Sequence, residues 1–273
     1  MHITKLILAA GAVASFSTGA LAADLAMAPP TQYYAPPPAD DFGGWYLRGD
    51  IGFSNQKVKE KQWHSYGDLL SLDQTNEFGT AGIFGVGIGY QINNWLRVDA
   101  TGQYRGNSNF NGTDRFTYSD SGVATPGIDT YTAGKSEWLV MANAYVDLGT
   151  WWSVTPFIGA GIGMSRNTIS NYVDTNTPTL GVATASSDSK WNLAWAIHTG
   201  LAYRVNPALT IELGYSYMHL GDGQTGVVST FDAPTLGNRM VFKGITSHDL
   251  KLGVRWNLDS PQVYAPPPLM RRG

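Results

Sequence analysis

Between Gly43 and Leu258 the chain repeats segments of about ten residues in which apolar and polar side chains alternate with a period of two. This period is that of a β-strand whose two faces meet different surroundings. Eight segments show it: 44–53, 84–90, 95–104, 137–148, 154–165, 191–205, 209–217 and 248–258. The alternation therefore predicts an all-β fold of eight strands.

The connections between these segments alternate between long and short. Long polar stretches occupy residues 59–78, 105–134, 166–190 and 220–247, whereas short turns occupy 91–94, 149–152 and 206–207. Short turns rich in Asn, Gly and Pro favour antiparallel hairpins. Four long loops on one side and three tight turns on the other are typical of an antiparallel up-and-down transmembrane β-barrel with external loops and periplasmic turns.

A soluble barrel would also alternate, so the position of the aromatic residues has to decide between the two. Two groups lie near opposite ends of the predicted strands. Trp45, Trp95, Trp151, Trp152 and Trp256 fall at the tight-turn end, and Tyr104, Trp138, Trp191, Trp195, Tyr217 and Phe242 fall nearer the long loops. Two such girdles match the two headgroup regions of a membrane, where one edge of an aromatic ring is wet and the other is in an apolar medium.

The less apolar face of the strands carries many charges. On a soluble barrel these residues would lie outside in water, but in a membrane barrel they point inward, where opposite charges on neighbouring strands pair. We predict an interior charge network that consists of Arg48, Asp50, Arg97, Asp99, Glu137, Asp147, Arg204, Glu212, Asp249, Lys251 and Arg255.

The two ends of the chain have a different composition from the barrel segment. Residues 1–22 have Lys5, an apolar run and a small-x-small site, which predict a signal peptide cleaved after Ala22. Residues 23–42 are rich in proline and predict an extended periplasmic spacer. The barrel is predicted at 43–258, and the tail at 259–273 repeats the sequence Tyr-Ala-Pro-Pro-Pro of the spacer.

Composition excludes several classes of function. The chain has no cysteine, so it has no disulfide, thiolate nucleophile or lipid-modified cysteine, and its formal charge of −3 gives no reason to expect nucleic acid as a partner. The five histidines lack metal-ligand spacing. Ser216 and Glu212 share a strand face but His219 has the opposite parity, so we expect neither catalysis nor a cofactor.

Two short motifs at the ends of the barrel segment carry a resemblance. The first strand reads GGWYLRGDIG over 43–52 and the last reads HDLKLGVRW over 248–256. With these motifs the chain resembles the opacity-protein-like outer-membrane β-barrel family of alphaproteobacterial envelopes, a family of porin-like and surface-antigen proteins. The resemblance implies the outer membrane of a Gram-negative bacterium, with membrane lipid, lipopolysaccharide and the barrel-assembly machinery as partners.

The same resemblance implies a link to peptidoglycan. Some family members are thought to be joined to the cell wall through a mature N-terminal Ala-Asp, and cleavage after Ala22 would expose Ala23 and Asp24. A spacer over 23–42 would span about 60 Å if it were wholly polyproline-like, at about 3.1 Å per residue.

These features predict a structural, surface-exposed protein that supports envelope integrity. Two alternatives stay open: a narrow conductance, and adhesion or ligand binding through the external loops. The loops hold Trp63, Tyr66, Phe110, Phe116, Tyr118, Tyr131, Tyr172 and Phe231. Such aromatics either serve as exposed recognition anchors or pack the loops against one another.

Overall fold

The computed structural model describes residues 44–62, 68–177, 180–230 and 238–258, all within one compact unit, Asp40–Gly273. Its strands are β1 (Gly44–Lys57), β2 (Glu60–Gln62), β3 (Leu69–Phe78), β4 (Ala81–Gln91), β5 (Leu96–Asp120), β6 (Val123–Asp147), β7 (Val154–Asn176), β8 (Val182–Ala185), β9 (Asp188–Asn206), β10 (Leu209–Thr230) and β11 (Arg239–Asn257). Among these residues no helix has the length and apolarity needed to cross a membrane.

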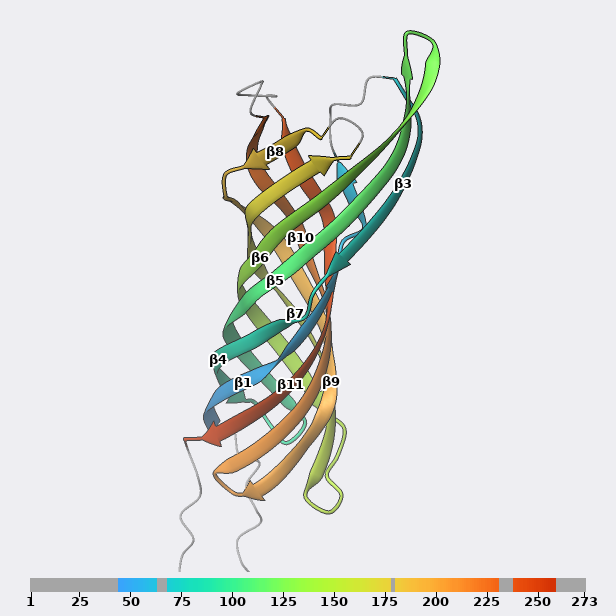
Figure 1. Cartoon of the computed structure of the whole chain (residues 1–273). Helices are drawn as coiled ribbons and strands as arrows, with labels where there is room; N and C mark the ends of the chain where they lie inside the picture. Colours follow the sequence, from blue (N-terminus) through green and yellow to red (C-terminus); the bar gives the residue numbers. More distant parts are fainter. Residues whose placement is uncertain (1–43, 63–67, 178–179, 231–237, 259–273) are drawn as a thin grey trace, which may run out of the picture. The chain divides into compact units, whose positions relative to one another are not determined.

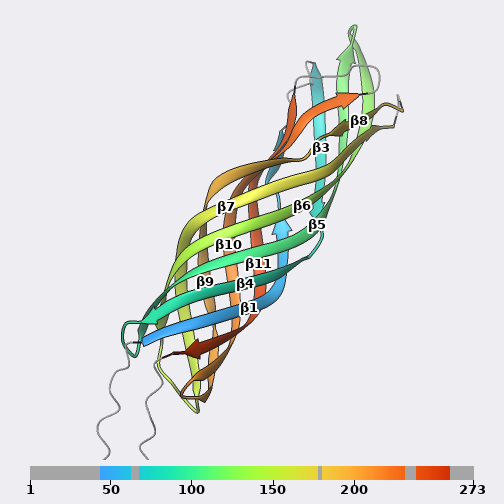
Figure 2. The same ribbon diagram turned by 90° about the vertical axis from the view of Figure 1, so that its left-hand side faces the viewer.

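Eight of the strands form a closed antiparallel ring. The order around the ring is β1, β4, β5, β6, β7, β9, β10 and β11, and pairing between β11 and β1 closes it (Figures 1 and 2). Closure matters because no water is present in the lipid core to satisfy an unpaired strand edge. The predicted eight-stranded up-and-down barrel is confirmed.

In the ring strands, apolar side chains are exposed and charged side chains are buried, which is the opposite of the pattern in a water-soluble protein. Outward side chains are apolar and exposed, such as Phe53 at 67%, Val86 at 70% and Leu193 at 67%, whereas inward charged side chains such as Asp50 and Arg97 are buried. A surface of this kind is stable only where acyl chains cover it. The direction of the apolar face, outward, is the one predicted for a membrane barrel.

The three predicted short turns are present, and asparagine side chains hold two of them. Asn93 Oδ1 accepts hydrogen bonds from the backbone N–H groups of Trp95 at 3.0 Å and Leu96 at 2.7 Å. Asn206 Oδ1 accepts from Ala208 and Leu209, both at 2.9 Å. Asparagine is favoured in turns because its short side chain satisfies nearby backbone donors in this way.

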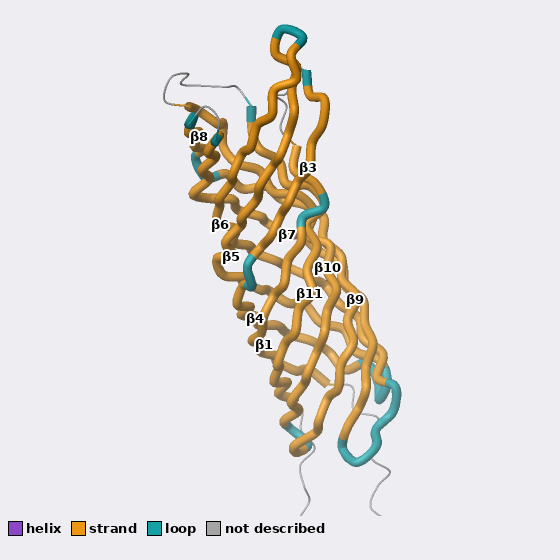
Figure 3. Tube along the Cα trace, turned by 45° about the vertical axis from the view of Figure 1, so that its right-hand side comes forward, coloured by secondary structure: helices purple, strands orange, loops and turns teal. Residues whose placement is uncertain are grey.

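The four long connections are largely β-structure, which differs from the loops we predict. β5 and β6 stay paired up to a tight turn at Ser121 and Gly122, whose φ angles of 51° and 86° suit a hairpin turn. β7 and β10 also continue past the predicted strand ends, and β2, β3 and β8 add further pairings, so that strand makes up most of the wall and loops are short (Figure 3).

The reason for this difference is a reversal of the alternation. Beyond the lipid, the outward side chains face water, so Asn109 and Asn111 point outward while Phe110 points inward. A search for apolar residues on the outward face therefore places the end of the strand where the surroundings change from lipid to water. The hydrogen-bonded pairing of the strands continues beyond that point.

Candidate functional site

The barrel interior is the candidate functional site, and one carboxylate lies at the centre of its ion pairs. Glu212 on β10 is 3.3 Å from Arg97 of β5, 3.1 Å from Arg255 of β11 and 3.6 Å from Arg48 of β1. All four side chains are more than nine-tenths buried. Three guanidinium groups from three strands thus converge on one acidic group.

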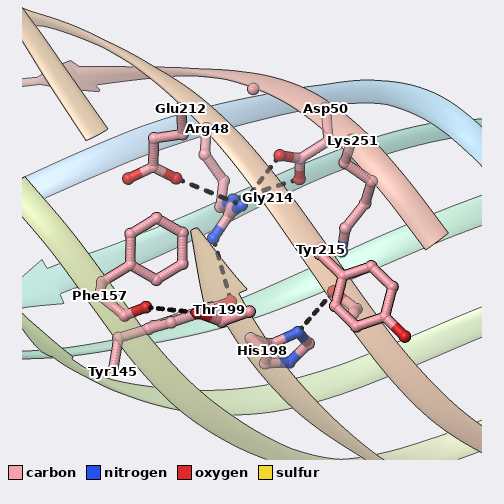
Figure 4. A pocket seen from close by; sticks show the side chains of 12 residues that line it. Arg48, Asp50, Tyr145, Phe157, His198, Thr199, Glu212, Gly214, Tyr215 and Lys251 are labelled. Atoms are coloured by element: carbon pink, nitrogen blue, oxygen red, sulfur yellow. Dashed lines mark hydrogen bonds and ion pairs between the residues drawn. The ribbon is translucent and has the colours of Figure 1, made fainter. Parts of the chain in front are cut away.

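Arg48 connects this centre to two further carboxylates. It lies 2.9 Å from Asp50 and 2.7 Å from Asp99, and its Nη1 donates a hydrogen bond of 3.1 Å to the Tyr145 hydroxyl. Figure 4 shows Arg48 between Glu212 and Asp50, with Tyr145 below it. Asp50 lies on β1 with Arg48, whereas Asp99, Tyr145 and Glu212 lie on β5, β6 and β10, so the guanidinium ties these four strands together.

A second group of ion pairs lies nearer the long connections. Arg105 is fully buried and lies 2.6 Å from Asp249 and 3.6 Å from Glu137, while Lys135 lies 2.6 Å from Glu137. Arg105 Nη1 also donates to the Ser247 hydroxyl at 2.9 Å. Arg105 and Lys135 are absent from the predicted network because both lie at the border of a segment predicted to be a loop. The parity of Arg105, which matches Arg97 and Asp99, was the signal that could have found it.

The charges of the two groups of ion pairs, taken together with Lys251, balance. The cations are Arg48, Arg97, Arg105, Lys135, Lys251 and Arg255, and the anions are Asp50, Asp99, Glu137, Asp147, Glu212 and Asp249. Lys251 is buried and lines a cavity of about 20 Å³ together with Arg48, Glu212 and His198. Six positive and six negative groups thus lie together in this part of the interior, and Lys61, Asp114 and Asp129 are buried nearer the long connections.

Arg204 does not belong to this network, so its assignment was wrong. It is exposed at the end of β9, next to the Asn206 turn. Strand parity gives the side of the sheet on which a residue lies but not its height along the barrel, and at the height of Arg204 the side chain is exposed.

Small residues on the inward face leave room for the large ones. A Cβ atom added to Gly89 would overlap with the ring of Tyr46, and one added to Gly161 would overlap with the Asn143 side chain. The glycines that alternate along β4 and β7 are therefore needed for packing inside the ring.

Beyond the ion pairs, towards the long connections, the interior is apolar. The buried cluster includes Phe110, Tyr131, Ile169, Leu220, Phe242 and Ile245, and the rings of Phe110 and Phe242 are 4.9 Å apart. Phe242 is thus a core residue, and our prediction that it belongs to the girdle near the long loops is wrong. Phe110, Phe116, Tyr131 and Tyr172 are all buried, which favours packing over their use as exposed anchors. Trp63, Tyr66 and Phe231 lie outside the described residues.

A small acidic cluster lies at the outer end of the barrel. Lys61 is 2.7 Å from Asp114, Gln74 donates to Asp114 at 3.2 Å, and Asn176 donates to Asp129 at 2.7 Å. Burial, together with the negative charges of Asp129 and Asp114, raises the pKa of Asp174 to about 7. This carboxyl is therefore partly protonated at neutral pH.

The five tryptophans of the predicted lower girdle are each at least half exposed and lie at the short-turn end. They are Trp45 at the start of β1, Trp95 before β5, Trp151 and Trp152 in the turn after β6, and Trp256 near the end of β11. Their position suits an interface with headgroups.

The residues considered for catalysis do not assemble. Ser216 is buried and lies 2.8 Å from His198 Nδ1, Glu212 is held by the arginines, and His219 points outward and stacks on Trp195. Ser216 and His198 lie inside the barrel and line the cavity of about 20 Å³.

The predicted cleavage site Ala22 and the predicted attachment residues Ala23 and Asp24 lie outside the described residues, as do the spacer and the C-terminal tail. Their roles stay predictions.

Comparisons with known proteins agree with this architecture. The family described as outer membrane protein beta-barrel domain matches residues 8–257. An uncharacterized protein of Brucella abortus is 32% identical over 235 residues, covering 80% of this chain and 81% of the relative. The outer membrane protein PagN of Salmonella typhimurium is 28% identical over 191 residues, covering 65% and 75%. The crystal structure of Neisserial surface protein A, 17% identical, is similar with a TM-score of 0.47 over 78% of this chain and 96% of that chain.

Proposed function

Since the chain belongs to the outer membrane protein beta-barrel domain family, we propose that it is a non-conducting structural protein that supports the envelope. It is an outer-membrane β-barrel of a Gram-negative bacterium, with its long strand extensions proposed to face the outside. The observation that carries the proposal is the filled interior, in which twelve charged groups are packed, eleven of them in ion pairs of 4 Å or less, and an apolar layer follows them.

The size of the ring supports this role. An eight-stranded barrel encloses a space just wide enough for its own side chains, whereas a general diffusion pore needs about 16 strands. Here Arg97 and Arg105 reach across that space and are completely buried. The cavity of about 20 Å³ beside Arg48 is close to the volume needed by one water molecule. Among the described residues, this packing supports a barrel that does not conduct solutes.

The test of this proposal is electrical recording. We expect the purified full-length chain, inserted in a planar lipid bilayer, to give no steady conductance, while a general diffusion porin in the same bilayer gives open channels. Insertion is verified by heat-modifiable migration on gels. A steady current that scales with salt concentration would overturn the structural role in favour of conductance.

We propose in addition that the mature N-terminus is joined to peptidoglycan through Ala23. A barrel fixed in the outer membrane by its strands and held to the wall by the proline-rich segment 23–42 would connect the two layers. Mass spectrometry of lysozyme-digested sacculi is expected to find a muropeptide on the α-amine of Ala23. Recovery of every molecule with a free α-amine would contradict the tether and leave the barrel's role in the membrane unaffected.

A further inference from the structure

The outward face of β7 changes character at one residue. Ile158, Ile162 and Met164 are exposed apolar side chains, and the next outward residue is Arg166, which is also exposed. Thr168 follows it on the same face. Arg166 therefore lies at the border between the lipid-facing band and the polar wall beyond it.

Two tryptophans flank this arginine on the neighbouring strands. Arg166 is directly opposite Trp138 of β6 and directly opposite Trp191 of β9. Both indoles point outward, with 56% and 54% of their surface exposed. Tyr104 continues the row on β5, with its ring 4.9 Å from that of Trp138. The row is the upper aromatic girdle, and it contains a single guanidinium.

Hydroxyl groups lie one step further from the lipid. Thr168 is opposite Ser136 on β6 and opposite Ser189 on β9, and the Thr168 and Ser189 hydroxyl oxygens are 2.9 Å apart. A ligand held by Arg166 would thus meet indole rings on both sides and hydroxyl groups above.

Within the described ranges, the Arg166 guanidinium has neither an ion pair nor a hydrogen bond. Two cations on the neighbouring and later strands are paired: Lys190 on β9 lies 3.1 Å from Asp222, and Arg239 on β11 pairs with Asp188. An unpaired charge at the edge of the lipid is costly, and a guanidinium satisfies its donors best with a bidentate phosphate or carboxylate. Indole N–H groups add donors at the same depth.

We propose that Arg166, Trp138 and Trp191 form a binding site for a phosphate group of lipid A, the anchor of lipopolysaccharide. The outer leaflet of this membrane consists of lipopolysaccharide, in which the phosphates are carried on sugars. The phosphate lies between the two indoles on Arg166, and the hydroxyls of Ser136, Thr168 and Ser189 contact the sugar ring. The inference rests on the outward orientation given with the proposed function, but not on the absence of conductance.

The site is tested with the full-length barrel in detergent micelles, titrated with lipid A and followed by native mass spectrometry. The wild-type chain is expected to bind lipid A with both phosphates at least about tenfold more tightly than lipid A from which the phosphates have been removed. Arg166→Gln is expected to lose about tenfold in affinity for the phosphorylated form and to bind the two forms equally. Arg166→Lys keeps the positive charge but not the bidentate guanidinium, and its affinity is expected to lie between those of the wild type and Arg166→Gln.

Arg115→Gln is the matched control, because Arg115 is an exposed arginine on β5 opposite Asp73, far above the aromatic row. We expect this variant to bind as the wild type does, and heat-modifiable migration verifies that every variant is folded. Unchanged binding by Arg166→Gln would overturn the site, as would an equal loss in Arg115→Gln. Displacement of lipid A by equimolar phosphatidylglycerol would overturn the assignment to lipopolysaccharide in favour of a phospholipid headgroup.

Discussion

Replacing Glu212 by Gln is expected to lower the free energy of unfolding of the barrel by about 3–5 kcal/mol, the range for removing one partner of a buried ion pair. The substitution keeps the shape of the side chain but takes away the charge on which Arg97, Arg255 and Arg48 converge. In this variant Arg97 still pairs with Asp147, and Arg48 still pairs with Asp50 and Asp99. Arg255 loses its one carboxylate within 4 Å among the described residues, so a charge stays buried without compensation.

The measurement is urea unfolding of the chain in lipid vesicles, followed by tryptophan fluorescence and by heat-modifiable migration. Glu77→Gln is the control, since Glu77 lies exposed on β3, and it is expected to change stability by less than about 0.5 kcal/mol. The double variant Glu212→Gln with Arg255→Gln is expected to recover part of the loss, because it removes both signs of charge. Equal unfolding midpoints for Glu212→Gln and the wild type would show that the convergence is energetically irrelevant.

The second large effect is expected from the smallest change, Gly163→Ala on β7. A Cβ atom at this position would overlap with the backbone carbonyl oxygen of Val140 and would lie 2.8 Å from the Met141 Cα on the neighbouring strand. Since both are backbone atoms, no side-chain rotation relieves the overlap, and β6 and β7 have to separate locally. We expect a loss of about 1–3 kcal/mol, as for other overpacked interiors.

Gly102→Ala on β5 provides the comparison for this prediction. No heavy atom lies within 4 Å of a Cβ at Gly102, so the added methyl group is expected to be neutral or to stabilise the barrel by up to about 1 kcal/mol through the unfolded state. The two variants are compared by the same urea unfolding experiment. If both alanines have the same effect, the inward glycines are not packing residues.

The fold could be predicted from the sequence because lipid covers the outer face of the sheet and the packed polar interior covers the inner face. Along β11, for example, Leu250, Leu252 and Val254 alternate with Lys251 and Arg255, and the structure has the first set exposed and the second buried. Such a pattern requires only strand periodicity and a membrane, and both act locally on each strand. The number of strands and the short turns followed from the same signal.

The features that could not be predicted from the sequence are those that depend on where a residue lies around the ring and along the barrel axis. Arg105 and Lys135 were missed because they border a segment predicted to be a loop, although both keep the inward parity of their strands, and Arg204 was wrongly included because parity does not give height. The contact of His198 with Asn143 at 3.2 Å joins residues 55 positions apart, and only the registers of three strands bring them together. Periodicity within a strand carries no information about these registers.

The equal numbers of positive and negative groups among the twelve side chains around Arg48 and Arg105 constrain how this protein evolves. A descendant that loses one interior carboxylate inherits a surplus cation in a place that water does not reach, and it survives only if an arginine or lysine is lost soon afterwards. Interior positions should therefore change in pairs of opposite charge on different strands, whereas the lipid-facing positions exchange one apolar residue for another without this constraint. Divergent descendants would keep the sum of charges in the lumen while exchanging the strands that supply them.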